Sequence, residues 1–356
     1  MTTISEQIEA IEKEIRETPY HKATEHHIGK LRAKLSKLKD KADEAARPRK
    51  SGPRQGYAVK KQGDATVVLI GPPSAGKSTL LNELTNAKSK VAPYVFTTVT
   101  VVPGMMEYKN ARIQVLDVPG LIEGAHLGRG RGREVLSVAR GADLIVFITD
   151  TKRTKVFDEI ESDLYENGIR INRQPPGVDI EKKPSGGIII HSNITQDLSK
   201  ETIKEVASEL GVKNAEITIR EKLDIDRLID AMSSNRVYLS AIYVVNKADL
   251  AHKPGKNSHL YVSAQTGEEL NKLREKIWEV LELVNVYLVT KDEEPSYANP
   301  LIMKVGDTLI DVAQKIGQEF VQDKKRAVIW GTGAKFPGQE VSLISPIQEG
   351  MMVRFV

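Results

Sequence analysis

The stretch Ala65-Thr-Val-Val-Leu-Ile-Gly71-Pro-Pro-Ser-Ala-Gly76-Lys77-Ser78 decides the fold, because an apolar run leads into a glycine-rich turn and then into a helical pattern. The turn fits GxxxxGK[ST]. Backbone N–H groups of such a loop at a helix N-terminus can converge on phosphate oxygens. Lys77 would reach the β and γ phosphates, and the Ser78 hydroxyl would coordinate Mg²⁺. The alternative is an ordinary glycine-rich turn between a strand and a helix.

Further apolar runs lie on the C-terminal side of this loop, and helical patterns separate them. With the first run they cover residues 65–71, 112–120, 142–150, 240–249 and 258–264. Near-continuous apolar runs at such intervals indicate buried parallel strands. The sequence therefore predicts a doubly wound α/β domain with a mostly parallel sheet.

Asp117-Val-Pro-Gly120 ends the next strongly apolar run. An acidic side chain there can hold Mg²⁺ through water, and the Gly120 amide can sense a γ phosphate. Taken alone the pattern DxxG is weak, because many strands end in Asp followed by a turn.

Asn246-Lys-Ala-Asp249 follows another buried run. Asp249 can accept two hydrogen bonds from the N1–H and the amine of guanine, a pattern that adenine lacks. Asn246 can tie its loop to the phosphate-binding turn, and the stem of Lys247 can lie along the base. Ser263-Ala264 follows the next run, where a backbone amide can meet guanine O6.

These four motifs come in the order of a guanine-nucleotide site, each at the carboxyl end of a strand, where α/β sheets bind ligands. Each would be an ordinary surface turn in isolation. A P-loop enzyme that uses ATP, such as a kinase, is a rival interpretation, and Asp249 argues against it.

The stretch Tyr94-Val-Phe96-Thr97-Thr98 lies between the first two motifs. A threonine hydroxyl here would complete the coordination of Mg²⁺ when the γ phosphate is present. The alternative is a β-branched strand, and the residues alone do not choose between Thr97 and Thr98.

The N-terminal segment is helical and locally basic. Apolar residues recur at helical spacing in two sets, Ile4, Ile8, Ile11, Ile15 and Ile28, Leu31, Leu35, Leu38, which predicts two antiparallel helices. The net charge of the chain is +4, yet residues 30–61 alone carry +9. The outward side of the second helix would carry Lys30, Lys34, Lys37 and Lys41. These lysines could be merely solvated, but the concentration of charge favours a polyanion such as RNA, with a protein partner next.

Two more segments extend the α/β domain. The interval between Asp150 and Asn246 holds 95 residues, more than one crossover needs. It carries strand and helix patterns of its own, so we expect an inserted α/β subdomain over residues 155–238. The tail from about residue 290 reads as strand, a helix capped by Asp307, and three further strands, which predicts a small β-grasp module.

Composition excludes several classes. The chain of 356 residues has no cysteine, which excludes disulfides, thiol catalysis and cysteine-ligated metals. Its charged N-terminus has no apolar signal core, and no run is long enough to span a membrane. We expect a monomeric cytoplasmic protein that does not bind membranes.

The motifs GPPSAGKST, YVFTTVTVVPG, DVPGLIEGAHLGRGRGREVL, NKAD and SAQTG, with the insertion and the tail, resemble the developmentally regulated GTP-binding (DRG) family within the Obg-like translation-factor GTPases. The resemblance spans essentially the whole chain. It implies a P-loop NTPase G domain with the following organisation: a basic N-terminal helical domain and linker over 1–60, the G domain over 61–289 interrupted by 155–238, and a ubiquitin-like β-grasp TGS domain over 290–356. The sequence departs from relatives at Pro72-Pro73, where relatives often show a larger residue before the proline, and at Ile316-Gly317, where relatives often carry Ile-His.

The resemblance further implies a GTPase that binds GTP or GDP with Mg²⁺ and acts on the ribosome or its rRNA. It places Mg²⁺ on Ser78, Thr98 and Asp117, and catalytic roles on Lys77, Thr98 and Gly120. The nucleotide-binding set is Gly71, Pro72, Pro73, Ser74, Ala75, Gly76, Lys77, Ser78, Thr79, Phe96, Thr97, Thr98, Asp117, Gly120, Asn246, Lys247, Asp249, Ser263 and Ala264.

Hydrolysis is expected to be slow without help. Many GTPases orient the attacking water with a Gln just after DxxG, and this sequence has Leu121 there. In the Obg-like relatives a monovalent cation or a partner commonly assists hydrolysis, and some of them hold K⁺ with the help of an Asn in the phosphate loop. This sequence has Ser74 at that position, and K⁺ is a candidate cofactor. Arg129, Arg131 or Arg133 could supply charge to the transition state or to RNA, or could be solvated on a glycine-rich loop.

The rival to the GTPase switch is a nucleotide-gated RNA-binding or scaffolding protein with negligible hydrolysis.

Overall fold

The structure, a computed structural model, describes residues 3–45, 62–85, 92–93, 100–118, 138–250, 259–291, 294–322 and 324–356. The chain divides into two compact units. Unit 1 combines residues 1–55 with 168–238, and unit 2 combines residues 56–167 with 239–356.

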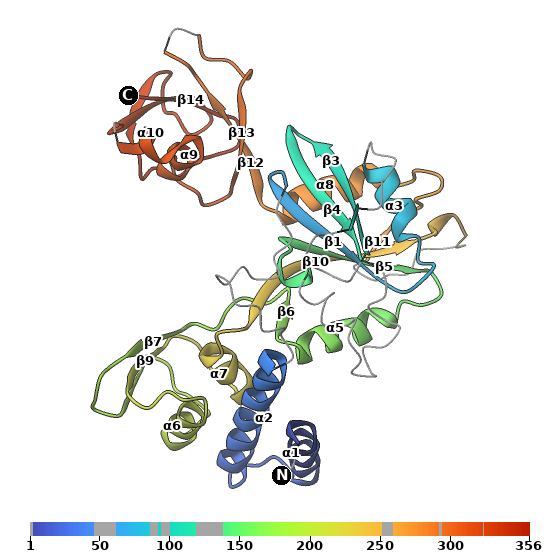
Figure 1. The fold of residues 1–356 in the computed structure, drawn as a ribbon. Coiled ribbons are helices and arrows are strands. Elements are labelled where there is room, and N and C mark those ends of the chain that lie inside the picture. Colours follow the sequence, from blue (N-terminus) through green and yellow to red (C-terminus); the bar gives the residue numbers. More distant parts are fainter. Residues whose placement is uncertain are drawn as a thin grey trace. The chain divides into compact units, whose positions relative to one another are not determined.

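Unit 2 is built on a mostly parallel sheet, as expected. Its order is β11-β10-β5-β1-β4-β3-β2, and a further strand, β6, pairs with β10. Strands β11, β10, β5, β1 and β4 pair in parallel, whereas β3 is antiparallel to β4 and to β2 (Figure 1). The strands are β1 (Ala65–Ile70), β2 (Ala92–Pro93), β3 (Thr100–Tyr108), β4 (Ala111–Asp117), β5 (Leu144–Asp150), β10 (Val237–Asn246) and β11 (Leu260–Tyr261). Strand β3 begins at Thr100, and Thr97 and Thr98 lie outside the described residues.

Helices cover both faces of this sheet. Val67 and Leu69 of β1 share a core with α3 (Lys77–Leu84) and α8 (Leu270–Val280). On the opposite face, Phe147 of β5 contacts Phe157 of α5 (Val156–Glu166), with ring centroids 6.5 Å apart. The doubly wound α/β prediction is confirmed, because β1 and β5 are buried on both faces.

The C-terminal part of unit 2 has a second sheet, of order β13-β12-β16-β14-β15. Its strands are β12 (Leu283–Leu288), β13 (Pro300–Lys304), β14 (Arg326–Gly331), β15 (Gln339–Ser342) and β16 (Met351–Phe355), and its helices are α9 (Leu309–Ile316) and α10 (Gln318–Gln322). Leu309 and Val312 of α9 pack into the core beneath it.

The expected cap of α9 was wrong. Thr308 is the N-cap, and Asp311 closes a capping box with it. Asp307 instead accepts a hydrogen bond from the Lys304 N–H, which closes the turn after β13. A Ser or Thr followed three residues later by an acid satisfies two orphan amides at a helix start, and Asp307 has no such partner three residues on.

Unit 1 combines the N-terminal helices with the inserted segment. It contains α1 (Ile4–Glu17), α2 (Glu25–Ala45), β6 (Ile169–Ile171), β7 (Val178–Lys182), β8 (Ile188–Ser192), α6 (Lys200–Glu209), β9 (Ala215–Ile219) and α7 (Ile225–Met232). Strands β7, β9 and β8 form a sheet in that order. Ile28 and Ala33 of α2 share one core with α6, α7 and this sheet. The inserted subdomain was expected over 155–238, and the segment that packs with α2 runs over 168–238.

The two N-terminal helices are confirmed, and they run antiparallel. Glu14 of α1 contacts His27 near the start of α2, whereas Glu12 contacts Lys39 further along it. Glu25, at the start of α2, accepts bonds from the Ser199 N–H and the Thr202 hydroxyl in the first turn of α6. Burial raises the pKa of Glu25, but these bonds and one from Lys22 outweigh burial and hold that pKa below its ordinary value.

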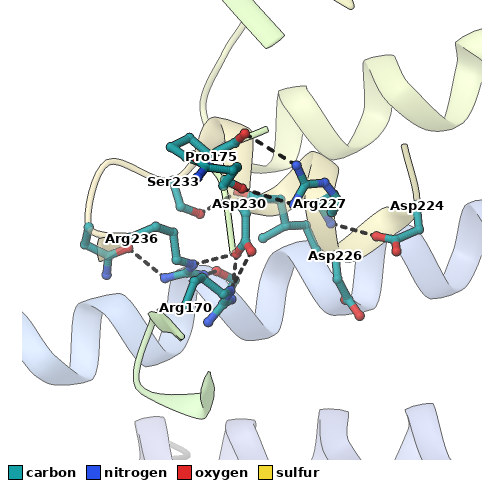
Figure 2. Close-up of polar contacts among 12 residues, drawn as sticks. Arg170, Pro175, Asp224, Asp226, Arg227, Asp230, Ser233 and Arg236 are labelled. Carbon is teal, nitrogen blue, oxygen red and sulfur yellow. Dashed lines mark hydrogen bonds and ion pairs between the residues drawn. The ribbon is translucent and has the colours of Figure 1, made fainter. Parts of the chain in front are cut away.

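A buried ion network ties α7 to β6 and α2. Asp230 accepts two hydrogen bonds from Arg170, each 2.6 Å long, and one of 2.9 Å from Arg236 (Figure 2). Arg236 also donates to the Ser36 hydroxyl on α2. The side chains of Asp230, Arg170 and Arg236 are at most 10% exposed. Burial of opposite charges is tolerated here because each carboxylate oxygen has a guanidinium partner.

Several basic residues of α2 are partly exposed and bind to other residues of the protein. Arg32 pairs with Asp226, Lys39 pairs with Glu12, and Lys37 donates to the Glu209 carbonyl oxygen at 2.6 Å. Lys37 therefore does not belong to the outward basic side that the sequence predicted. The predicted linker over 46–60 lies outside the described residues.

None of the described helices is both long and apolar enough to span a membrane.

Asp230→Ala should destabilise unit 1 by about 3–5 kcal/mol, because it removes the carboxylate that two buried arginines share. Amide hydrogen exchange in α6, α7 and β9 measures the free energy of opening.

Asp226→Ala is the matched control. Its ion pair with Arg32 is about two-fifths exposed, so the loss should be under about 1 kcal/mol. Equal protection losses in the two variants would contradict the account of the buried network.

Candidate functional site

The predicted motifs converge at one edge of the unit 2 sheet. β1, β4, β5 and β10 are parallel, so their carboxyl ends meet there; Leu69 pairs in register with Asp117, and Asn246 with Asp150. The glycine-rich loop leaves β1 at this edge, and the NKAD loop leaves β10. Sequence spacing alone predicted this meeting, and the register shows it.

Two glycines of the loop are required by space and by backbone conformation. A Cβ on Gly71 would lie 1.9 Å from the Ile148 carbonyl oxygen, because the loop crosses closely over β5. Gly76 has φ +88°, and a Cβ there would lie 2.3 Å from the Asn246 side-chain nitrogen. Gly76 is also the N-cap of α3, so the loop delivers its amides to a helix N-terminus.

Side-chain donors hold the carbonyl oxygens of the loop. Lys77 Nζ donates to Gly71 at 2.9 Å and to Pro72 at 3.0 Å. Lys247 Nζ donates to the Ser74 carbonyl at 2.7 Å. The Ser74 carbonyl belongs to the peptide unit that carries the Ala75 N–H, and the two point in opposite directions, so this peptide can present its amide to an anion. The Gly71 and Pro72 carbonyls precede prolines, so their peptide units have no N–H to present.

Asn246 joins three parts of the site. Its Nδ2 donates to the Ala75 carbonyl at 2.9 Å, and its Oδ1 accepts from the Ala264 amide at 3.0 Å. The side chain is 2% exposed, so both bonds are shielded from water. Asn246 thus ties the NKAD loop to the phosphate-binding loop, as the sequence predicted. The sequence predicted that a backbone amide at Ser263-Ala264 can meet guanine O6, and the Ala264 amide is engaged by Asn246, so a base would have to compete for that amide.

Ser78 and Asp117 come together as a candidate Mg²⁺ site. The Ser78 hydroxyl donates to Asp117 Oδ2 at 2.6 Å. The other oxygen of Asp117, Oδ1, is buried and has no hydrogen-bond partner among the described residues. Hard oxygen donors with one unpartnered buried carboxylate oxygen fit Mg²⁺.

Asp249 is exposed in a short 3₁₀ turn, Ala248–Leu250, which leaves its carboxylate open to a ligand. Ser263 is fully buried and its hydroxyl accepts from the Thr266 amide, so its side chain supports the turn. Pro73 and Ser74, within the loop, and Thr79, just after it, are exposed.

Some predicted residues lie outside the described part of the chain. These are Phe96, Thr97, Thr98, Gly120, Leu121, Arg129, Arg131 and Arg133.

The sequence interpretation gave no role to Asp150 and Arg153, which also lie at this edge. Arg153 donates twice to Asp150 and once to the Pro73 carbonyl at 3.1 Å. An acid at the end of a buried strand with an arginine three residues later is the signal that could have drawn attention to them.

Family models match the chain in three consecutive segments. A model described as 50S ribosome-binding GTPase matches residues 66–182, the C-terminal region of the same domain matches 185–283, and the TGS domain matches 284–356.

Similar proteins share the full length of the chain. An uncharacterized GTP-binding protein of Methanocaldococcus jannaschii is 43% identical over 99% of this chain and 93% of its own. Developmentally-regulated GTP-binding protein 1 of Xenopus laevis is 38% identical over 98% of both chains, and developmentally-regulated GTP-binding protein 2 of Homo sapiens is 38% identical over 99% of both. Among solved structures, the YchF GTPase of Schizosaccharomyces pombe matches with 13% identity and a TM-score of 0.44, over 85% of this chain and all of that one.

Asn246→Ala should weaken guanine-nucleotide binding roughly 5- to 100-fold, because it leaves the Ala75 carbonyl and the Ala264 amide without their partner. Titration with a fluorescent mant-GDP measures the change. Asn271→Ala, on the surface of α8, is the control and should bind like wild type. Unchanged affinity in Asn246→Ala would contradict the bridging role.

Proposed function

Because the chain belongs to the family of developmentally regulated GTP-binding proteins, we propose that it is a Mg²⁺-dependent GTPase that hydrolyses GTP to GDP and phosphate and acts as a switch on the translation machinery. The observation that carries the nucleotide site is the bridge of Asn246 between Ala75 and Ala264. It binds the phosphate-binding loop and the base-binding loop into one rigid site, so a nucleotide is recognised at both ends.

Guanine selectivity rests on Asp249. Its exposed carboxylate follows Asn246 by three residues, and carboxylate oxygens accept the two donors on the edge of guanine. Adenine has no such pair of donors there.

Asp249→Asn should shift preference from guanine to xanthine nucleotides by roughly 10- to 100-fold, since an amide donor matches the xanthine carbonyl that replaces the guanine amine. Competition of GTP and XTP against mant-GDP measures the ratio. Asp158→Asn, exposed on α5, is the control. A variant at Asp249 that kept its preference for GTP would overturn the assignment.

Ser78 and Asp117, with Thr98 outside the described residues, would hold Mg²⁺. The ion neutralises charge on the phosphates. Lys77 Nζ donates to the Gly71 and Pro72 carbonyls, and it would reach the β and γ phosphates of a bound nucleotide.

Slow intrinsic hydrolysis follows from Leu121, since a leucine cannot orient water. K⁺ near Ser74, a partner protein, or one of Arg129, Arg131 and Arg133 would then supply the missing element. The rival function, a nucleotide-gated RNA-binding or scaffolding protein, differs in having no turnover under any of these conditions.

Single-turnover hydrolysis should be slower than about 10⁻² s⁻¹ for the protein alone, and faster in K⁺ than in Na⁺ at equal ionic strength or with ribosomes. No turnover in K⁺ with ribosomes would favour the rival. Replacing Arg129, Arg131 and Arg133 by Ala one at a time tests whether one of these arginines assists hydrolysis. Unchanged hydrolysis rates in all three variants would exclude that role.

Contact with RNA rests on three lysines of α2, which we term the lysine ridge: Lys30, Lys34 and Lys41. All three are exposed, and the described residues provide no ion-pair partner for them. At 100° per residue they lie within about 40° of one another, along about 16 Å of one helix face. This ridge is what remains of the predicted basic side once paired residues are removed. A regulatory protein partner is the alternative occupant.

Replacing the lysine ridge by Gln should weaken binding of the full chain to rRNA and lower the slope of log affinity against log salt by about 2 to 3, at roughly 0.7–0.9 for each lost phosphate contact. Lys155, Lys291 and Lys335, all exposed in unit 2, form the control set. Co-sedimentation with ribosomes in a GTP analogue and in GDP tests the switch. An unchanged slope in the ridge variant would contradict the contact.

A further inference from the structure

The phosphate-binding loop has five successive carbonyl oxygens, and each accepts a hydrogen bond from a side chain. Lys77 donates to the carbonyls of Gly71 and Pro72. Lys247 donates to the carbonyl of Ser74, and Asn246 donates to the carbonyl of Ala75. The remaining carbonyl, that of Pro73, accepts from Arg153 at 3.1 Å. Lys77, Asn246 and Lys247 belong to the recognised motifs, and Arg153 does not.

The Arg153 side chain is braced. Its Nε and Nη2 both donate to Asp150 Oδ2, at 3.0 and 2.7 Å, so one carboxylate oxygen fixes the plane of the guanidinium. Asp150 ends β5 and also accepts from the Lys152 backbone amide at 3.1 Å. The same Nη2 that contacts Asp150 reaches Pro73, so the bond to the loop starts from a preorganised donor.

Charge reinforces this arrangement. Burial raises the pKa of Asp150, but the bonds from Arg153 and the Lys152 amide, with the nearby charge of Lys247, outweigh burial and hold that pKa below its ordinary value. The Asp150 carboxylate therefore interacts with both cationic side chains, Arg153 and Lys247, that hold the carbonyls of Pro73 and Ser74.

We propose that Arg153 is a positioning residue of the nucleotide site, which holds the Pro73 carbonyl outward and thereby slows the release of bound nucleotide. The inference rests on the proposed binding of guanine nucleotides. The amides of this loop cradle the α and β phosphates, which GDP and GTP share, so the effect should be equal for both. Arg153 does not take part in the chemical step.

The competing interpretation is an ion pair between Asp150 and Arg153 that only closes the turn before α5. Such a partly exposed pair contributes little to stability and nothing to ligand release. The two interpretations differ in what Arg153→Ala changes: nucleotide dissociation in one, and at most thermal stability in the other.

The experiment measures dissociation of mant-GDP and of a non-hydrolysable mant-GTP analogue from the full chain in Mg²⁺, after mixing with excess unlabelled nucleotide. Arg153→Ala should raise both dissociation rates about tenfold, which is the loss of one charged hydrogen bond. Arg153→Lys should bring both dissociation rates back to within about threefold of wild type. A lysine can reach the Pro73 carbonyl but cannot bond to Asp150 at the same time. The single-turnover hydrolysis rate from the bound state should stay within twofold.

Lys152→Ala is the matched control, since Lys152 contacts Asp150 through its backbone amide and its side chain is exposed. Its dissociation rates should equal those of wild type. Dissociation rates of Arg153→Ala within twofold of wild type, or a rise for one nucleotide only, would overturn the proposal. A wild-type chain that binds neither mant nucleotide would instead refute the proposed function. Thermal unfolding of each variant identifies a folding defect, and rescue by Arg153→Lys separates positioning from destabilisation.

Discussion

The nucleotide site depends on one buried side-chain amide. Asn246 is almost completely shielded from water, and an amide in that position must use both its donor and its acceptor. Its Nδ2 donates to the Ala75 carbonyl in the phosphate-binding loop, and its Oδ1 accepts from the Ala264 amide in the turn after β11. Loops that follow three different strands are therefore fixed to one another before any ligand binds. Gly76 is the necessary counterpart, because only a residue without Cβ leaves room for that amide.

Unit 1 follows a different principle, in which charged side chains of the inserted segment and of α2 bind within the unit. Arg170 and Arg236 share Asp230 in a buried network that reaches α2, and Glu25 accepts from the first turn of α6. These contacts join α2 to a segment that begins more than 120 residues later in the chain. The number of basic residues in α2 therefore overstates how many of its side chains are available to a polyanion. Among the described residues, the lysine ridge is the set that stays available.

The sequence predicted elements better than it predicted partners. Apolar runs and helical periodicity predicted β1, β4, β5 and β10 and the two N-terminal helices, because burial imposes those periods locally. The phosphate-binding loop and NKAD were predicted with their contact through Asn246, since both follow parallel strands of one sheet. Spacing could not show that α2 packs on the inserted segment, because that contact joins distant parts of the chain. Nor could it show that Arg153 holds Pro73, since 80 residues separate them. The cap of α9 was missed because Asp307 and Thr308 are both good capping residues, and only the position of Asp311 decides between them.

The central claim is that these loops form a site that distinguishes guanine from adenine through Asp249 while Asn246 holds the loops together. The most direct test is a competition titration of GDP and ADP against mant-GDP bound to the full chain in Mg²⁺. The account predicts that GDP binds at least about 100-fold more tightly than ADP, because two donors of guanine meet a carboxylate that adenine cannot satisfy. Comparable affinities for the two nucleotides would contradict it.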